Sequence, residues 1–528
     1  MIAASAGGTA DATRVGERCW QDVRVLASDA MEGRRAGSEG HRRAARFVAA
    51  EFRKAGLKPG GSASVSKGDD AYLQPVQLEM RKINEAGSSL HLVTKGEKRP
   101  LMLGDDAGFL LRGNFEREVN APLVFVGHGL RLPEYGVDDL AGLDLKGKVV
   151  VAFNSAPTSV PGAVGAHHGS AAERWKIYGA AGAVGVVLIP NPFSTDLPWA
   201  RAIQSRLEPF MVLRGLDDQF AGQKLWVAFN PERLTVLLQG TSHKAEDLLA
   251  LLKDGKSMPH FDLPASLSAV IDVQVSAIES ENVVGVLPGS DPRLRDELVV
   301  LSGHLDHLGV KERGEGDRLF NGALDNAAGI AVMLQIARDL AKGKAPKRSI
   351  VFAAVTAEEM GLLGSRAYVA HAQAAGQKIV ANLNSDMFLP LYPFKHMVVF
   401  GLEESNLADD ARAVAKELGV EVQSDPQPQR NRFIRSDQYS FIRAGVPALA
   451  TKIGVLPDSP EAGIERKWLT ERYHAVGDDL DQPVDLAAMG GYQELMKRLA
   501  VRVADRDTRP GWFPASVFSK LATAGKEP

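Results

Sequence analysis

Apolar residues recur at helical spacing along the first part of the chain. From Arg14 to Gly56 they fall on one face of a helix, interrupted once by the glycine-containing stretch Glu32–Gly37. This pattern predicts two helices joined by a turn. The residues that follow, up to position 120, alternate apolar and polar positions in short runs, which is typical of small antiparallel strands.

Between positions 121 and 263 the pattern changes to short apolar runs around a helix-like segment, Ala172–Ala181. The runs of strand length are Leu123–Phe125, Lys148–Phe153 and Val184–Leu188. We interpret this change as a separate, β-rich domain inserted into the chain.

From Glu297 onward, strand-length apolar runs alternate with amphipathic segments of helix length. The runs are Leu298–Leu301, Ile350–Val355, Ile379–Leu383, Met397–Phe400 and Ala448–Ile453. Such alternation is typical of an α/β architecture, so we predict a mostly parallel mixed sheet flanked by helices. Residues 14–120 and 264–528 would form this main domain, and residues 121–263 would form the insert.

Length and composition narrow the class of protein. A chain of 528 residues exceeds what one hydrophobic core usually organises, and 45% hydrophobic with 24% charged residues is an ordinary globular composition. Because 62 Lys and Arg residues nearly balance 65 Asp and Glu residues, we expect no nucleic acid or anionic membrane as partner. The single cysteine, Cys19, excludes an intramolecular disulfide and any multi-cysteine zinc site, so a metal would need His, Asp and Glu ligands.

Neither a membrane span nor a secretory signal is predicted. The longest apolar stretches, such as Ala183–Ile189, are far shorter than the roughly 18 residues that a membrane-spanning helix needs. The segment Met1–Thr13 lacks a basic region followed by an apolar one, as a signal peptide would have.

Polar residues that can bind metals follow three of the predicted strands. Ligands of α/β sheets bind beyond the carboxyl ends of the strands, so these positions are the first to inspect. His304 and Asp306 follow the first strand, Glu358-Glu359 the second, and Asp386 the third. We expect these side chains to converge at one edge of the sheet.

Two further candidates lie outside the strand ends. Asp325, or its neighbour Asn326, is expected at the cap of a helix with apolar residues from Ile330 to Leu340. His474 follows Tyr473 in a polar, loop-like stretch far along the chain.

Each of these residues alone has an ordinary structural explanation. An aspartate at a helix start usually caps the helix, and paired glutamates before a helix commonly favour its N-terminal dipole. Together, however, the histidines and acids suit zinc, and a site with two metal ions needs one carboxylate to bridge them. We take Asp325 as that bridge, with Glu359 as a ligand and Glu358 as the general base toward the metal-bound water. The pair His167-His168, which has no acid immediately beside it, is expected to be a surface feature.

Taken in chain order, these segments resemble the M28 metallopeptidases, a family of secreted bacterial and fungal aminopeptidases that also includes glutamate carboxypeptidase-like members. The motifs that carry the resemblance are Gly303–His307, Leu324–Gly329, Ala357–Ser365, Asn384–Met387 and Tyr473-His474. The resemblance implies a zinc-peptidase sandwich fold with two zinc ions. One ion would be held by His304 and Asp386, the other by Glu359 and His474, and Asp325 would bridge them.

The resemblance also implies roles for three residues beside the ligands. Glu358 would be the general base, and Asp306 would orient His304 through a carboxylate on its second ring nitrogen. Tyr473 would donate a hydrogen bond to the tetrahedral oxyanion, although a packing role for its ring remains open.

Two further stretches extend the likeness. Ser436–Phe441 resembles a family motif in which histidine frequently stands at the position of Gln438. The predicted insert resembles a protease-associated (PA) domain in three segments: Val124–Gly129, Asp144–Val150 and Gly179–Leu188.

The resulting prediction is a zinc-dependent exopeptidase, an aminopeptidase acting on peptide substrates, with an extracytoplasmic, periplasmic or secreted location implied by the family. Glutamate carboxypeptidase-like or dipeptidase activity stays open, because Arg430, Arg432 and Arg435 could recognise a substrate carboxylate. The family resemblance is also compatible with a single-zinc glutaminyl cyclase, which catalyses an intramolecular acyl transfer, and with a receptor-like ectodomain without metals. The number of bound zinc ions would separate these classes.

Overall fold

The computed structural model describes residues 6–61, 67–194, 198–215, 219–311 and 315–520. Residues 1–5, part of the segment without a signal-like pattern, lie outside these ranges. The chain divides into two compact units, the first formed by Met1–Gln77 with Glu279–Pro528 and the second by Leu78–Ile278.

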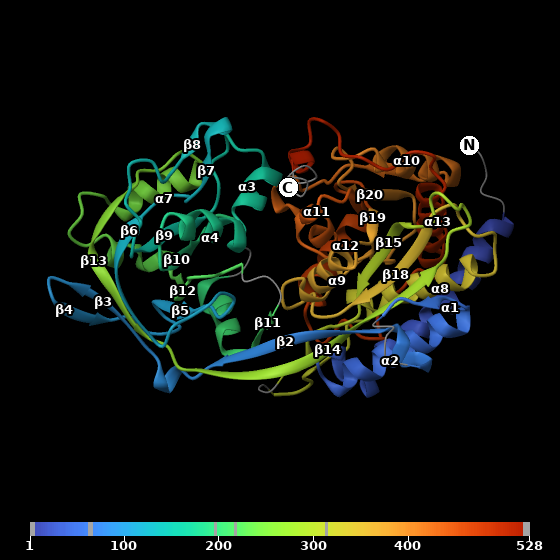
Figure 1. The fold of residues 1–528 in the computed structure, drawn as a ribbon, viewed down its shortest axis with the longest axis horizontal. Coiled ribbons are helices and arrows are strands. Elements are labelled where there is room, and N and C mark those ends of the chain that lie inside the picture. The colour runs from blue at the N-terminus through green and yellow to red at the C-terminus, as the bar shows by residue number, and fades with distance from the viewer. Residues whose placement is uncertain (1–5, 62–66, 195–197, 216–218, 312–314, 521–528) are drawn as a thin grey trace. The chain divides into compact units, whose positions relative to one another are not determined.

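A mixed β-sheet runs through the first unit (Figure 1). Its central strands β18, β15, β19 and β22 are parallel to one another, whereas β14 and β20 pair antiparallel to this group at its two sides. The five strands predicted after Glu297 are all present. In sheet order the strands are β11 (Phe210–Leu213), β2 (Leu73–Ile83), β14 (Val273–Leu287), β18 (Ser349–Val355), β15 (Glu297–His304), β19 (Lys378–Asn384), β22 (Ala448–Gly454), β20 (His396–Phe400) and β21 (Glu421–Gln423), with β1 (Lys58–Pro59) beside β14.

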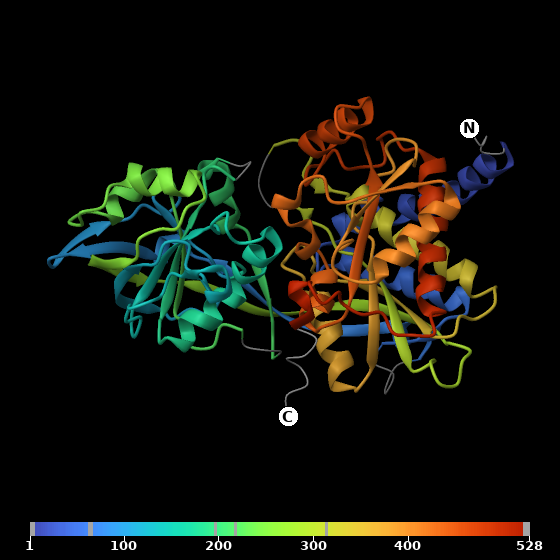
Figure 2. The same ribbon diagram turned by 90° about the horizontal axis from the view of Figure 1, so that it is seen from above.

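Helices cover both faces of this sheet, because the central strands are apolar on both sides. In β15, Val299 packs into the core on one face and Val300 into the core on the other. The larger core contains residues of α1 (Ala6–Leu26), α2 (Glu39–Ala55), α8 (Ala328–Leu340), α10 (Leu407–Leu418) and α13 (Leu486–Ala504), and the smaller one contains residues of α9 (Leu363–Ala374) and α11 (Gln438–Arg443). Figure 2 shows helices on both sides of the sheet. The helix α12 (Pro460–Glu471) follows β22.

The two N-terminal helices predicted around a glycine-containing turn are α1 and α2, separated by the 3₁₀ turn Asp29–Arg34. Gly33 in this turn has φ 63°, and a Cβ atom there would lie 2.4 Å from the carbonyl oxygen of Phe320. The turn therefore needs glycine, and it lies against loops that follow the central strands.

The second unit has its own sheet, parallel in the middle (β6, β9, β10, β12) and antiparallel at both sides. In sheet order the strands are β4 (Glu97–Pro100), β3 (Ser89–Thr94), β13 (Phe261–Val270), β6 (Glu118–Phe125), β9 (Val149–Asn154), β10 (Gly185–Pro190), β12 (Leu225–Phe229) and β5 (Ala107–Phe109). Its helices are α3 (Gly162–His168), α4 (Ala171–Ala180), α5 (Trp199–Ala202), α6 (Leu234–Leu237) and α7 (Ala245–Lys253).

This unit begins earlier and ends later than the predicted insert 121–263. The strands β3, β4 and β5, which the prediction assigned to the main domain, pair in the sheet of the second unit. Local alternation identifies a strand but not the sheet that it joins, and the predicted boundary was therefore misplaced.

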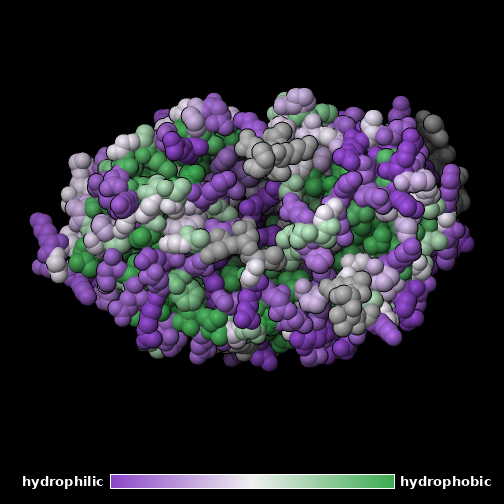
Figure 3. Space-filling model, in the orientation of Figure 1, coloured by the Kyte–Doolittle hydropathy of each residue, from purple (hydrophilic) through white to green (hydrophobic). Residues whose placement is uncertain are grey.

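On the face drawn in Figure 3, hydrophilic and hydrophobic residues are interspersed over the surface. Within the described ranges, no helix is long and apolar enough to cross a membrane.

Candidate metal centre

The predicted ligands lie on loops at the carboxyl ends of neighbouring strands. His304 is the last residue of β15, Glu359 follows β18 and Asp386 follows β19. Asp325 lies in the turn Ala323–Ala327 before α8, and His474 follows α12. The structure brings these five side chains together. For His304, Glu359 and Asp386, this convergence was predicted from their positions after neighbouring parallel strands.

Asp325 is the centre of the cluster. Its Oδ1 atom lies 3.2 Å from His304 Nε2, and its Oδ2 atom lies 3.3 Å from His474 Nε2. A second carboxylate accompanies each imidazole: Asp386 Oδ1 lies 3.2 Å from His304 Nε2, and Glu359 Oε2 lies 3.2 Å from His474 Nε2. Two His–carboxylate pairs therefore share one aspartate through its two different oxygens.

Asp325 is not the helix cap that the sequence predicted. The N-cap of α8 is Ala327, and Asp325 has non-helical backbone angles, φ −115° and ψ 90°. Because the backbone departs from the helix at this residue, the carboxylate contacts the imidazoles instead of the first amides of α8.

The prediction that the Asp306 carboxylate contacts the His304 ring is wrong, because the main chain of Asp306 makes this contact instead. His304 Nδ1 lies 3.0 Å from the main-chain carbonyl oxygen of Asp306. The carboxylate instead accepts hydrogen bonds from the amides of Glu358, at 3.0 Å, and Glu359, at 3.4 Å. Asp306 therefore fixes the His304 ring through its backbone and the Glu358-Glu359 turn through its side chain.

The pKa values of the two adjacent glutamates, Glu358 and Glu359, are shifted in opposite directions. Burial and the charges of Asp386, Glu359 and Asp437 raise the pKa of Glu358 well above its usual value, although nearby His304 opposes this. Burial and Asp325 also tend to raise the pKa of Glu359, but hydrogen bonds from His307 and His474 outweigh them and lower it to about 2. Glu359 is thus held as an anion, whereas Glu358 binds a proton far more readily.

Two buried residues beside the cluster were given no role by the sequence. His307 is fully buried, and its Nδ1 atom lies 2.8 Å from Glu359 Oε1. Asp437, at the start of α11, is also fully buried, and burial raises its pKa to about 7. His307 lies three positions after His304, and this closeness in the sequence was the available signal. The sequence does not reveal, however, which carboxylate His307 contacts.

Gln438, which stands where the family often has histidine, joins two elements next to the cluster. Its side-chain oxygen accepts a hydrogen bond from Asn384 at 2.8 Å, and its side-chain nitrogen donates to the carbonyl of Phe433 at 3.0 Å. The residue thus connects α11 to the end of β19, just before Asp386.

Tyr473 is 40% exposed, and its ring centroid lies 4.0 Å from that of His474. Partial burial and the carboxylates of Asp325 and Glu359 raise the pKa of its phenol, which therefore stays protonated. A protonated phenol beside the cluster can donate a hydrogen bond.

A second group of potential ligands lies in the other unit. The ligand atoms of His167, His168 and Glu173 lie within 4.8 Å of one another, at the adjoining ends of α3 and α4. His167 is buried, which contradicts the surface position expected from the sequence.

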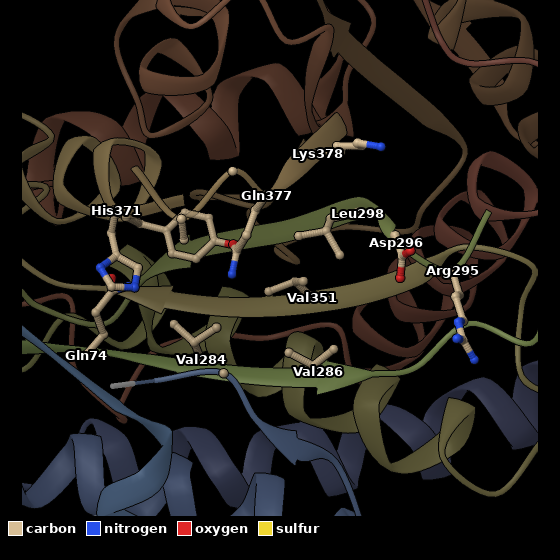
Figure 4. Close-up of a pocket in the computed structure, with 14 residues that line it drawn as sticks. Gln74, Val284, Val286, Arg295, Asp296, Leu298, Val351, His371, Gln377 and Lys378 are labelled. Atoms are coloured by element: carbon tan, nitrogen blue, oxygen red, sulfur yellow. The ribbon is translucent and has the colours of Figure 1, made fainter. Parts of the chain in front are cut away.

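A pocket in the first unit lies away from the cluster (Figure 4). Its apolar side chains include Val284, Leu298 and Val351, and Lys378 and His371 are among its polar ones. Because Leu298 and Lys378 stand near the amino-terminal ends of β15 and β19, this pocket is separate from the loops at their carboxyl ends.

One known protein family matches the region of the chain that contains the candidate metal ligands. Residues 282–500 match the model of Peptidase family M28. This part of the chain is therefore similar to peptidase family M28. The matched range contains His304, Asp325, Glu359, Asp386 and His474, whereas His167, His168 and Glu173 lie outside it.

Two fungal proteins are similar to part of this chain. A probable leucine aminopeptidase 2 of Aspergillus fumigatus is 29% identical over 244 residues, which are 43% of this chain and 46% of that protein. The probable leucine aminopeptidase 2 of Aspergillus oryzae is 30% identical over 247 residues, again 43% and 46% of the two chains. The alignments thus span less than half of these relatives.

A solved structure, an aminopeptidase from Aneurinibacillus sp. strain AM-1, matches over 95% of this chain and 97% of its own, with a TM-score of 0.54 and 20% identity. This likeness confirms the mixed α/β fold.

Proposed function

We propose that the protein is a zinc-dependent aminopeptidase. Its two zinc ions would bind at the cluster formed by His304, Asp325, Glu359, Asp386 and His474. The observation that carries the proposal is the position of Asp325, whose two oxygens face two separate His–carboxylate pairs. A bridging carboxylate between two sites is what a co-catalytic pair of metal ions needs. Zinc content per chain is the direct test, with two ions expected for the peptidase and one for a cyclase.

The side chains present fit zinc. His304 and Asp386 would hold one ion, Glu359 and His474 the other, and Asp325 would bridge them. The lowered pKa values of Asp325 and Glu359 keep both carboxylates anionic although they are buried. Several buried anions in one cluster are stable only with cations close by, and bound metal ions would supply that charge.

Zinc ions bound there would polarise the scissile carbonyl and lower the pKa of the attacking water. Glu358 would take the proton of that water, and its raised pKa suits a group that accepts a proton and returns it to the leaving amine. Tyr473 would donate a hydrogen bond to the oxyanion. Asp306 would hold His304 and the Glu358-Glu359 turn in place through the contacts described above.

The preference for the amino end of the peptide is supported by the names of the two Aspergillus relatives, both probable leucine aminopeptidases. We further propose, from the sequence likeness alone, that the second unit contains a PA-like domain and that the protein works outside the cytoplasm. Amino-acid 4-nitroanilides should be hydrolysed, and substrates with a blocked amino end and a free carboxylate should not. Hydrolysis of only the latter would indicate a carboxypeptidase.

We expect His307→Phe to weaken zinc binding at the Glu359–His474 side of the cluster. Phenylalanine keeps an aromatic ring in the buried space but removes the hydrogen bond between His307 Nδ1 and Glu359. Loss of such a contact to a ligand typically costs 10- to 100-fold in metal affinity. After dialysis against low zinc, the variant should retain about one zinc ion while the parent retains two, by atomic absorption.

The matched control for this change is His128→Phe. His128 is also fully buried, and its ring contacts Ser155 and the carbonyl of Lys256 in the second unit. This variant should lose stability but keep the zinc content of the parent. Equal zinc loss in both variants would mean that burying any phenylalanine in place of histidine disturbs the site, and the role of His307 would then be rejected.

A further inference from the structure

Arg34 is fully buried and its guanidinium is surrounded by main-chain carbonyl groups. Nε donates to Leu305 at 2.8 Å, and Nη2 donates to Gly322 at 2.8 Å. Nη1 donates to Leu26 at 2.7 Å and to Asn321 at 2.6 Å. One side chain from the N-terminal turn thus binds four backbone oxygens from three different segments.

Two of these segments carry two of the five proposed zinc ligands, His304 and Asp325. Leu305 lies between His304 and Asp306, and Asn321-Gly322 leads directly into the turn that contains Asp325. Such loops have few hydrogen bonds of their own, so Arg34 supplies donors to carbonyl oxygens that are buried with it; among these, the oxygen of Gly322 also accepts a hydrogen bond from the amide of Ala327 at 3.2 Å.

Asp478 holds the Asp325 loop from its other side. Its Oδ1 atom accepts a hydrogen bond from the amide of Leu324 and its Oδ2 atom one from the amide of Asp325, both at 2.9 Å. Its main-chain oxygen accepts from the amide of Ala323 at 3.1 Å. Asp478 is fully buried, and although burial lowers the pKa of Arg34, the charge of Asp478 opposes this effect.

We infer that Arg34 and Asp478 are positioning residues that fix the backbone around Asp325, and thereby set the affinity of the chain for its metal ions. The inference rests on the proposed zinc site. Arg34 binds the carbonyls of Asn321 and Gly322, which precede Asp325. Asp478 binds the amides of Leu324 and Asp325. These contacts prevent the backbone from rotating the Asp325 carboxylate away from the imidazoles of His304 and His474. A guanidinium suits the task because it has five donors in a rigid plane, which a lysine ammonium does not reproduce.

The test is Arg34→Lys, with zinc affinity measured by competition with a chromogenic chelator well below the unfolding temperature. Because lysine keeps the charge but cannot bind all four carbonyls, we expect affinity to fall roughly 10- to 100-fold. At limiting zinc, kcat should fall with occupancy. At saturating zinc, kcat should recover and KM for the substrate should stay near the parent value, which a general loss of structure would not produce.

The matched control is Arg348→Lys, which changes another fully buried arginine of the same unit. Arg348 stands just before β18, at the amino-terminal end of that strand, where it binds Glu297 and the carbonyls of Ala504 and Arg506. This variant should unfold at a lower temperature than the parent but bind zinc with unchanged affinity.

Asp478→Asn provides an independent variant, since it keeps the size of the side chain but replaces one acceptor with a donor. It should also weaken zinc binding. If both Arg34→Lys and Asp478→Asn lower only the unfolding temperature, or if Arg348→Lys lowers zinc affinity as much, the positioning role is wrong. If the parent itself binds no zinc, the proposed function fails instead.

Discussion

Glu358→Gln is expected to lower kcat by roughly 10²- to 10⁴-fold, the usual contribution of a general base. Glutamine keeps the size and shape of the side chain but cannot take a proton from the attacking water. Glu358 is not one of the carboxylates paired with His304 or His474, so zinc content should stay at the parent value. KM should change little, and kcat and kcat/KM should fall together because the lost interaction acts in the transition state.

The adjacent change, Glu359→Gln, is the matched comparison and should behave differently. Glu359 lies 3.2 Å from His474 and 2.8 Å from His307, so its replacement disturbs one zinc site directly. Zinc content and activity should decrease together, and added zinc should restore part of both. If Glu358→Gln loses zinc and Glu359→Gln keeps it, the two roles are reversed. If neither change affects turnover, the hydrolytic proposal fails.

Removal of zinc by a chelator is expected to abolish peptide hydrolysis and to lower the temperature of unfolding. Asp325, Glu359 and Asp386 gather around two imidazoles, and without cations these carboxylates repel one another in a buried setting. By mass action, a site at a free zinc concentration 100 times its Kd contributes about 2.7 kcal/mol of stability. Activity and differential scanning calorimetry should therefore change in parallel, and added zinc should restore both.

Two controls separate metal removal from other effects of the chelator. The chelator saturated with zinc beforehand should leave activity and unfolding temperature unchanged. Glu359→Gln, which is expected to bind less zinc, should show a smaller shift in unfolding temperature than the parent. Hydrolysis that survives chelation, with metal removal verified by atomic absorption, would overturn the proposed zinc site.

The sequence by itself determined the five strands after Glu297, in the region similar to peptidase family M28, and the types of residue that follow three of them. Apolar runs such as Ile350–Val355 predicted the strands, because a strand covered by helices on both faces must be apolar throughout. Since parallel strands end at one edge, the convergence of His304, Glu359 and Asp386 could also be predicted. The roles of these residues followed from a family resemblance, and they remain proposals.

Only the tertiary structure decided which atoms meet and which sheet each strand joins. The carbonyl of Asp306 rather than its carboxylate contacts His304, and His307 contacts Glu359, which is 52 positions further along the chain. Arg34 and Gly322 are 288 positions apart, yet they share a hydrogen bond, and β3 joins the second sheet although it precedes the predicted insert. Periodicity reports which face of an element is buried, but it carries no information about the partner on that face. Contacts between distant segments are set by packing of the whole chain, so no local pattern could have revealed them.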